Sequence, residues 1–191
     1  MAQFPANNDL SRLDGGDGFK ISGPESFGKI QSAASAGDVN GDGFAGLIVG
    51  APDAFIYRSN DGASYVIFGK ASGFGATFDV STLNGSNGSI LSGIGGIQDP
   101  GDLVGGSVAS AGDINGDSYA DLIVGAELSD AHGRDSGASY VVFGKAGGFN
   151  ANLRLSTLDG AATASSSAAR RPTAAIRWAR QATSTATALP T

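Results

Sequence analysis

The chain has 191 residues, of which 41% are apolar, and this length is enough for one ordinary domain or two small ones with a buried core. It has no cysteine, which excludes disulfides and thiolate metal sites, and its single histidine, His132, argues against zinc sites and histidine-based catalysis. The 18 acidic residues outnumber the 12 basic ones. This balance argues against nucleic acid and anionic lipid as partners, but it suits a cation.

No stretch approaches the roughly 20 apolar residues of a membrane span, and no secretory leader follows Met1, so we expect no membrane insertion. The 31 glycines predict many tight turns. The sequence changes character after residue 160, because all the glycines and all the acids precede residue 161, whereas residues 161–191 contain four arginines.

A tandem repeat organises residues 1–160. Residues 34–85 align with residues 109–160 at a shift of 75 without a gap, and 30 of the 52 aligned positions are identical. Residues 19–23 also resemble residues 89–93. Such self-similarity is typical of architectures built from stacked units.

Each repeat is predicted to be β-structure. Residues 47–49 and 65–68 are short runs rich in branched and aromatic residues between glycine, aspartate and asparagine, which is typical of buried strands. Residues 32–35 and 19–22 are expected to form weaker, partly exposed strands. Four short strands in about 70–75 residues fit one blade of a β-propeller or one unit of another stacked β-architecture. Since about three or more such units are needed for stability, two units suggest a fragment of a larger protein.

The predicted boundaries follow from the repeat. Residues 1–23 are expected to be trailing strands of a preceding blade, residues 24–93 the first repeat and residues 94–160 the second. Residues 161–191 are expected to be a disordered tail produced by a frameshift. Read one base out of frame, codons 182–191 permit Gly-Asp-Val-Asn-Gly-Asp-Gly-Phe-Ala-Asp, which matches the loop described next. A disordered linker and a basic nucleic-acid arm are the alternatives, and reading the coding DNA distinguishes them.

Two oxygen-rich loops carry the strongest chemical signal, at residues 38–46 and 113–121. Both place carboxylate or amide oxygens at alternate positions with glycine between them, and Ca²⁺ needs 6–8 oxygen ligands at about 2.3–2.6 Å. In the second loop the candidate ligands are the side chains of Asp113, Asn115 and Asp117, the carbonyl of Tyr119, and Asp121. Gly46 stands at the position of Asp121, so the first loop is expected to bind calcium more weakly.

Other interpretations of the loops are possible. An EF-hand needs a glutamate at loop position 12, where this chain has Val49 and Val124. Mg²⁺ fits less well, because it demands octahedral geometry and resists dehydration. The motif could also be only a turn, since all its residues favour turns. Two copies in register in an acidic chain favour calcium.

These motifs resemble the FG-GAP repeat of the integrin α-subunit propeller. The resemblance covers residues 1–160 and is carried by Phe-Gly at 27–28, the loop at 38–46 and Gly-Ala-Pro at 50–52. The second copy keeps the loop but has Val-Gly at 104–105 and Gly-Ala-Glu at 125–127. The two near-identical repeats of this chain resemble those of bacterial surface proteins more than those of animal integrins.

The resemblance implies an all-β propeller with antiparallel four-stranded blades, of which this chain would form a partial, truncated propeller. It also implies calcium between strands and an adhesive or extracellular binding role. The family's metal positions correspond to Asp38, Asn40, Asp42, Phe44, Asp113, Asn115, Asp117, Tyr119 and Asp121. It also implies a protein or glycan ligand, association with further blades, and an extracellular or cell-surface location for the parent protein.

Three interpretations of function remain. The first is a non-catalytic, calcium-binding module that presents a rigid surface to a protein or glycan. The second is part of a propeller-bearing hydrolase, although no nucleophile, base and orienting group are seen together in the sequence. The third is a truncated fragment without independent function. His132 is expected to be a solvated loop residue.

Overall fold

The computed structural model describes residues 9–23, 28–56, 61–93 and 101–158. The predicted all-β class is confirmed, since this part of the chain contains ten strands and three single-turn 3₁₀ helices. The strands are β1 (Lys20–Ser22), β2 (Ser32–Gly37), β3 (Gly46–Ala51), β4 (Ala63–Ile67), β5 (Thr77–Asp79), β6 (Gly88–Ser92), β7 (Val104–Gly112), β8 (Asp121–Ala126), β9 (Ala138–Val142) and β10 (Asn152–Arg154). The 3₁₀ helices are η1 (Leu10–Arg12), η2 (Val80–Thr82) and η3 (Leu155–Thr157).

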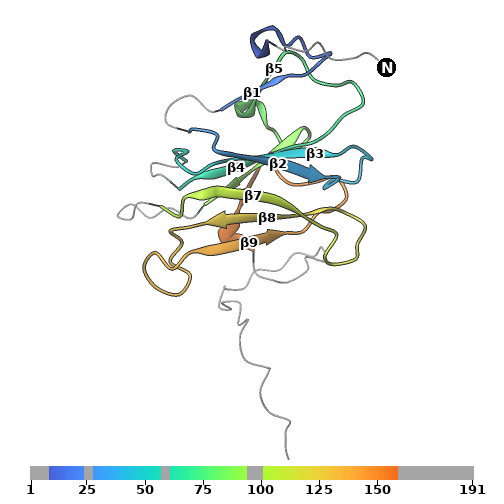
Figure 1. The fold of residues 1–191 in the computed structure, drawn as a ribbon. Helices are drawn as coiled ribbons and strands as arrows, with labels where there is room; N and C mark the ends of the chain where they lie inside the picture. Colours follow the sequence, from blue (N-terminus) through green and yellow to red (C-terminus); the bar gives the residue numbers. More distant parts are fainter. Residues whose placement is uncertain (1–8, 24–27, 57–60, 94–100, 159–191) are drawn as a thin grey trace, which may run out of the picture.

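The strands form three sheets that lie in layers (Figure 1). In the first repeat, β2, β3, β4 and β6 are joined in antiparallel order, and β10 adds a fifth strand to this sheet. In the second repeat, β7, β8 and β9 form an antiparallel sheet. The 75-residue shift places the counterpart of β6 at residues 163–167, which are outside the described residues, as is the whole of the predicted tail.

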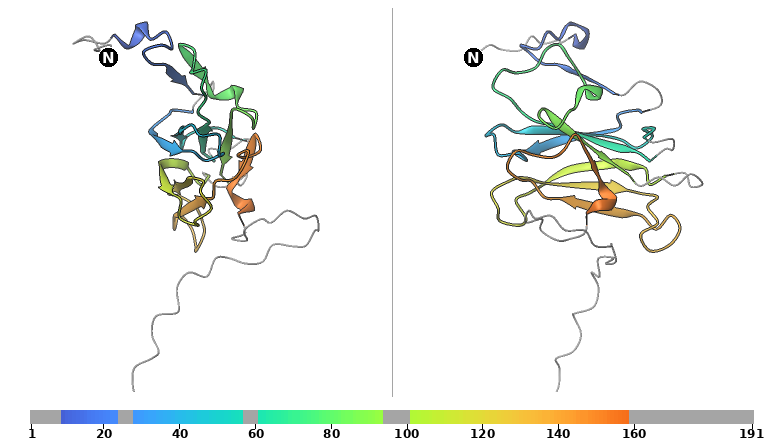
Figure 2. Two further views of the ribbon diagram at one scale, coloured as in Figure 1. Left: turned by 90° about the vertical axis from the view of Figure 1, so that its right-hand side faces the viewer. Right: turned by 180° about the vertical axis from the view of Figure 1, so that it is seen from behind.

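A short strand from each repeat pairs with the sheet that precedes it. β5 lies between β4 and β6 in sequence, yet it pairs in parallel with β1. Its repeat counterpart β10 pairs in parallel with β6, beside which it lies in Figure 2. The Ser89 hydroxyl also donates to the Asn150 carbonyl at 2.6 Å. Consecutive repeats are therefore linked by main-chain hydrogen bonds as well as by side-chain packing.

The first repeat is the middle layer and is buried on both faces. Successive side chains of a strand point to opposite faces, so Ile48 packs in the core between the two repeats, while Val49 packs in the core against β1 and β5. The two sheets lie so close at Gly50 that the Gly105 carbonyl leaves no room for a side chain there. Among the described residues, no helix is long and apolar enough to cross a membrane.

Tyr65 and Tyr140 are repeat counterparts that differ in their hydrogen bonding. The buried Tyr65 hydroxyl has no partner among the described residues, and burial raises its pKa to about 12. The Tyr140 hydroxyl lies 3.3 Å from the Ser129 hydroxyl. An unpartnered buried hydroxyl is destabilising, by about 1–3 kcal/mol.

We therefore expect Tyr65→Phe to leave the free energy of unfolding unchanged or to raise it by up to about 1 kcal/mol, and Tyr140→Phe to lower it. The wild type should also lose stability above pH 10, where the unfolded state releases the tyrosine proton that the folded state retains. Urea unfolding of the wild type and of both variants at pH 7 and pH 11 measures these changes in the free energy of unfolding. Destabilisation of Tyr65→Phe at pH 7 would contradict it.

Candidate metal centre

The two oxygen-rich loops connect equivalent strands and contact each other. Residues 38–45 join β2 to β3, and residues 113–120 join β7 to β8, so both loops lie at the same end of the stacked sheets (Figure 1). The ring of Tyr119 in the second loop lies against Gly41 in the first and leaves no space for a side chain there. The two candidate sites are therefore neighbours.

The first aspartate of each loop holds the loop closed. The Asp38 carboxylate accepts hydrogen bonds from the main-chain N–H groups of Gly41, Asp42 and Gly43 at 2.7, 3.1 and 2.9 Å. Asp113 accepts three equivalent bonds at the same distances. An ionised carboxylate has about four acceptor positions, so each of these side chains retains the capacity for a further interaction.

The third and fifth loop positions bring an amide and a carboxylate together. Asn40 Nδ2 donates to Asp42 Oδ2 at 2.8 Å, and Asn115 Nδ2 donates to Asp117 Oδ2 at 2.9 Å. The other oxygens of these aspartates accept the N–H groups of Phe44 and Tyr119. Rotation of the amide by half a turn would place its oxygen beside the carboxylate, at the spacing of about 3 Å that two oxygens on one Ca²⁺ require.

Carboxylates alone do not complete a site. Within the described part of the chain, no group of three or more acidic or histidine side chains converges on one point. The first loop supplies two carboxylates and one amide, and the second supplies one amide, two carboxylates and a third carboxylate, Asp121. The carbonyl oxygens of Phe44 and Tyr119 follow in sequence. The donor set therefore fits a hard cation such as Ca²⁺ only if amide, main-chain and water oxygens contribute.

Asp121 lies in a different environment from the other acids of its loop. It is fully buried, and its two oxygens accept the N–H groups of Ile114 at 2.8 Å and Gly144 at 2.9 Å. It therefore links the second loop to the end of β9. At the equivalent position, a side chain on Gly46 would meet the Ile67 carbonyl at 2.6 Å. The first loop thus has no room for this carboxylate without rearrangement.

The second repeat clamps the first loop through its main chain. The carbonyls of Asp38, Val39 and Asn40 accept N–H groups of the second repeat at 2.9–3.0 Å. The donors are Ala120, Lys145 and Gly147. Asp38 and Asn40 are consequently half-buried, whereas Asp113 and Asn115 are exposed. These donors could not be predicted from the sequence, because a main-chain N–H is present in almost every residue type.

Ser118 occupies a backbone conformation that favours glycine. Its φ is 74°, and its counterpart Gly43 has a φ of 85°. We expect Ser118→Gly to raise the free energy of unfolding by about 0.5–1 kcal/mol, because a side chain destabilises the left-handed region. Gly43→Ser should lower it by a similar amount, since the added Cβ would meet no atom within 4 Å and only backbone strain remains. Thermal unfolding of the wild type and of the two variants measures these changes. Equal stability of the three proteins would contradict the expectation.

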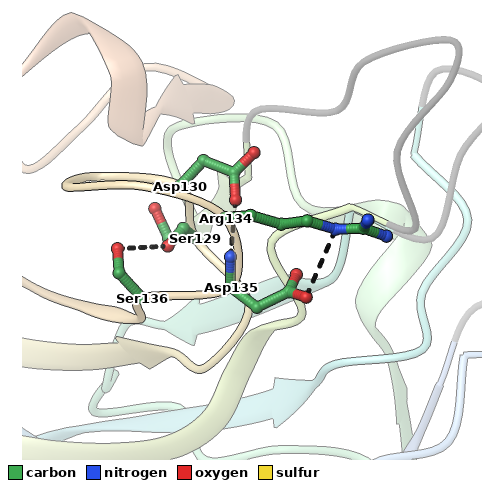
Figure 3. A network of polar contacts seen from close by, with 5 residues as sticks. All are labelled: Ser129, Asp130, Arg134, Asp135 and Ser136. Atoms are coloured by element: carbon green, nitrogen blue, oxygen red, sulfur yellow. Dashed lines mark hydrogen bonds and ion pairs between the residues drawn. The ribbon is translucent and has the colours of Figure 1, made fainter.

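The loop that contains His132 forms no catalytic set among the described residues. As predicted, His132 is exposed. Its surroundings are held by local contacts (Figure 3): Asp130 Oδ1 accepts the Asp135 N–H at 2.7 Å, and Ser136 Oγ donates to the Ser129 carbonyl at 3.2 Å. Arg134 lies 3.6 Å from the Asp135 carboxylate and is exposed. These contacts are those of a surface loop held by local hydrogen bonds.

An open cleft of about 640 Å³ lies between the repeats at the opposite end of the strands. It is lined by small residues together with the polar side chains of Gln31, Ser107, Glu127 and Ser139. Gln31 is held by a hydrogen bond from its amide to Asp53 at 2.9 Å. The cleft therefore offers polar contacts at a place distant from the two loops.

Comparison with known proteins identifies the repeat. The family model described as the FG-GAP repeat matches residues 31–67 and 104–142. Each matched segment contains one of the oxygen-rich loops together with the strands on both sides of it. No curated protein matches the chain.

Proposed function

The chain carries two FG-GAP repeats, and on this basis we propose that it is a non-catalytic, calcium-binding module whose rigid surface binds a protein or glycan. The FG-GAP repeat is a β-propeller-type, non-catalytic unit that typically occurs in extracellular proteins. We accordingly propose an extracellular or cell-surface location. The observation that carries the calcium proposal is the identical hydrogen-bonded closure of two loops by Asp38 and Asp113.

The proposed ligands are those of the two loops. For the first site they are the side chains of Asp38, Asn40 and Asp42 and the carbonyl of Phe44. For the second site they are the side chains of Asp113, Asn115 and Asp117, the carbonyl of Tyr119, and Asp121 through its remaining lone pairs. A bound cation would offset the negative charge of the carboxylates in each loop and hold the strand connections rigid. The partner is proposed to use the polar cleft between the repeats.

Calcium is expected to raise the thermal stability of the 191-residue chain. At a free concentration of 100 times the dissociation constant, one site adds about 2.7 kcal/mol, which corresponds to a rise in Tm of about 5–10 °C for a chain of this size. Calorimetric titration with CaCl₂ and thermal unfolding with and without chelator measure the effect.

The matched control is the double variant Asp42→Asn/Asp117→Asn. It removes one charge from each loop but keeps an oxygen that can accept the Phe44 or Tyr119 N–H. We expect it to lose calcium binding while its Tm in chelator stays close to that of the wild type. Absence of binding heat and an unchanged Tm for the wild type at millimolar CaCl₂ would exclude the proposal.

A further inference from the structure

We propose that Asn115, in the second loop, is a site of spontaneous covalent modification, in which its side-chain amide becomes a carboxylate by way of a cyclic imide. The reaction is favoured where asparagine precedes glycine, because glycine has no side chain to hinder the approach of its main-chain nitrogen. Asn115 is followed by Gly116. The inference concerns the exposure and the hydrogen bonding of this dipeptide, so it stands whether or not the loops bind calcium.

The reaction requires only water as a co-reactant. The Gly116 nitrogen forms a bond to Asn115 Cγ, and the bond from Cγ to Nδ2 breaks. The proton of the Gly116 N–H leaves with Nδ2 as ammonia, so the five-membered imide is neutral. Water then opens the imide at one of its two carbonyl carbons, which gives aspartate or isoaspartate at position 115. Since the reacting groups belong to adjacent residues, the first step is intramolecular.

The chain contains four asparagine–glycine pairs that differ in exposure. They are Asn40-Gly41, Asn84-Gly85, Asn87-Gly88 and Asn115-Gly116. Both residues are exposed only in the last pair, whereas each of the other three pairs includes at least one residue that is half-buried or buried. At Asn115, therefore, water can enter and ammonia can leave without any opening of the fold.

Asn40 provides the matched comparison, because it occupies the same position of the first loop and its neighbours are nearly the same. The N–H groups of Gly41 and Gly116 donate to Asp38 and Asp113 at the same distance, 2.7 Å. The attacking nitrogen is thus held in the same way in both loops. A difference in reactivity must come from contacts outside the loop itself.

The second repeat holds Asn40 in place. The carbonyl carbon of Asn40 would become part of the imide ring, and the oxygen of this carbonyl accepts the Gly147 N–H at 2.9 Å. Gly148 lies so close that a side chain there would meet Asn40 Cβ at 3.2 Å, and the Tyr119 ring lies against Gly41. Ring closure at Asn40 therefore requires these contacts to break first.

Asn115 is not held in this way within the described part of the chain. No hydrogen-bond donor of the described residues reaches its carbonyl oxygen, and a side chain on Gly116 would meet no atom within 4 Å. Asn115 Oδ1 accepts the Asp117 N–H at 3.0 Å. Because negative charge develops on this oxygen as the nitrogen attacks Cγ, the Asp117 N–H favours the attack.

Packing restrains the two remaining pairs. A side chain on Gly85 would meet the Ala151 nitrogen at 3.0 Å, so this glycine lies against the main chain of the second repeat. Gly88 is buried at the start of β6, where a side chain would meet the Val66 carbonyl. Ring closure at either asparagine would displace packed main chain.

The modification would change the charge of the second loop. Asn115 Nδ2 donates to Asp117 Oδ2 at 2.9 Å. An aspartate at position 115 has no such donor and would place a second carboxylate beside Asp117. Isoaspartate also lengthens the main chain by one atom, which would disturb the three hydrogen bonds that the loop makes to Asp113.

The test follows all four asparagines in the unaltered 191-residue protein, kept at pH 8 in chelator. Mass spectrometry of its peptides measures the conversion, because an oxygen replaces the amide nitrogen, and fragmentation assigns each conversion to one residue. We expect Asn115 to convert at least about tenfold faster than each of the other three, which must first be released by local opening. In a parallel sample unfolded in guanidinium chloride, all four should convert at similar rates.

Three results would overturn the proposal. The first is conversion of another of the four asparagines as fast as Asn115 in the folded protein. The second is a folded protein in which Asn115 stays unconverted while the unfolded chain reacts. The third is an advantage of Asn115 that persists in guanidinium chloride, because it would then arise from the neighbouring sequence and not from the fold.

Discussion

Ile48→Ala is expected to lower the free energy of unfolding by about 2–5 kcal/mol, because truncation of a fully buried isoleucine removes apolar contacts and leaves a cavity. Ile48 lies in the core between the two repeats and is completely inaccessible to solvent. The matched substitution Ile123→Ala removes the same atoms from the same position of the second repeat. It should change the free energy of unfolding by less than about 0.5 kcal/mol, since Ile123 is partly exposed.

Urea unfolding followed by circular dichroism measures both variants under the same conditions. The comparison is internal, because the two isoleucines share their sequence neighbours and their position in the strand. Equal loss of stability would mean that Ile123 is as well packed as Ile48, and it would contradict the asymmetry between the repeats.

Asp121→Ala is expected to lower the free energy of unfolding by about 3 kcal/mol. The buried carboxylate accepts the N–H groups of Ile114 and Gly144, and its removal leaves the buried Gly144 N–H without an acceptor. Each lost bond to a charged group contributes about 1.5–3 kcal/mol. Because the two bonds join the second loop to the end of β9, the loop should also become more open to exchange with solvent.

Chemical unfolding and amide hydrogen exchange at Ile114 and Gly144 test this prediction in the presence of chelator, where no cation contributes. Glu127→Ala is the control, because it removes an exposed carboxylate just beyond the other end of the same strand. Unchanged stability together with unchanged exchange in Asp121→Ala would show that the carboxylate does not hold the loop.

The repeat and its main strands could be predicted from the sequence for a simple physical reason. Branched and aromatic residues at 47–49 and 65–68 can be buried on both faces only in a strand between two layers, and the structure places them in β3 and at β4. The pairing of β5 with β1 and of β10 with β6 could not be predicted. These three-residue strands have no apolar alternation of their own, and their partners belong to the preceding repeat.

The candidate site was predicted only from the spacing of its oxygen-bearing residues. This spacing does not show how each side chain is oriented or how deeply it is buried. Residue-by-residue, the two loops differ only slightly, so the sequence could not show that Asp38 is half-buried while Asp113 is exposed. That difference arises because the second repeat covers the first loop. Likewise, the position of Asp121 in the loop pattern did not indicate that both its oxygens already bind main-chain N–H groups.

Tyr119 belongs to one loop and contacts the other, which bears on how the two loops can be studied by luminescence. Its carbonyl belongs to the second loop, while its phenol ring lies against Gly41 of the first. Excited phenol transfers energy to a nearby lanthanide, so terbium bound at either of the two proposed sites would lie near this ring. Tyr119→Phe would then lower the terbium luminescence from both proposed sites.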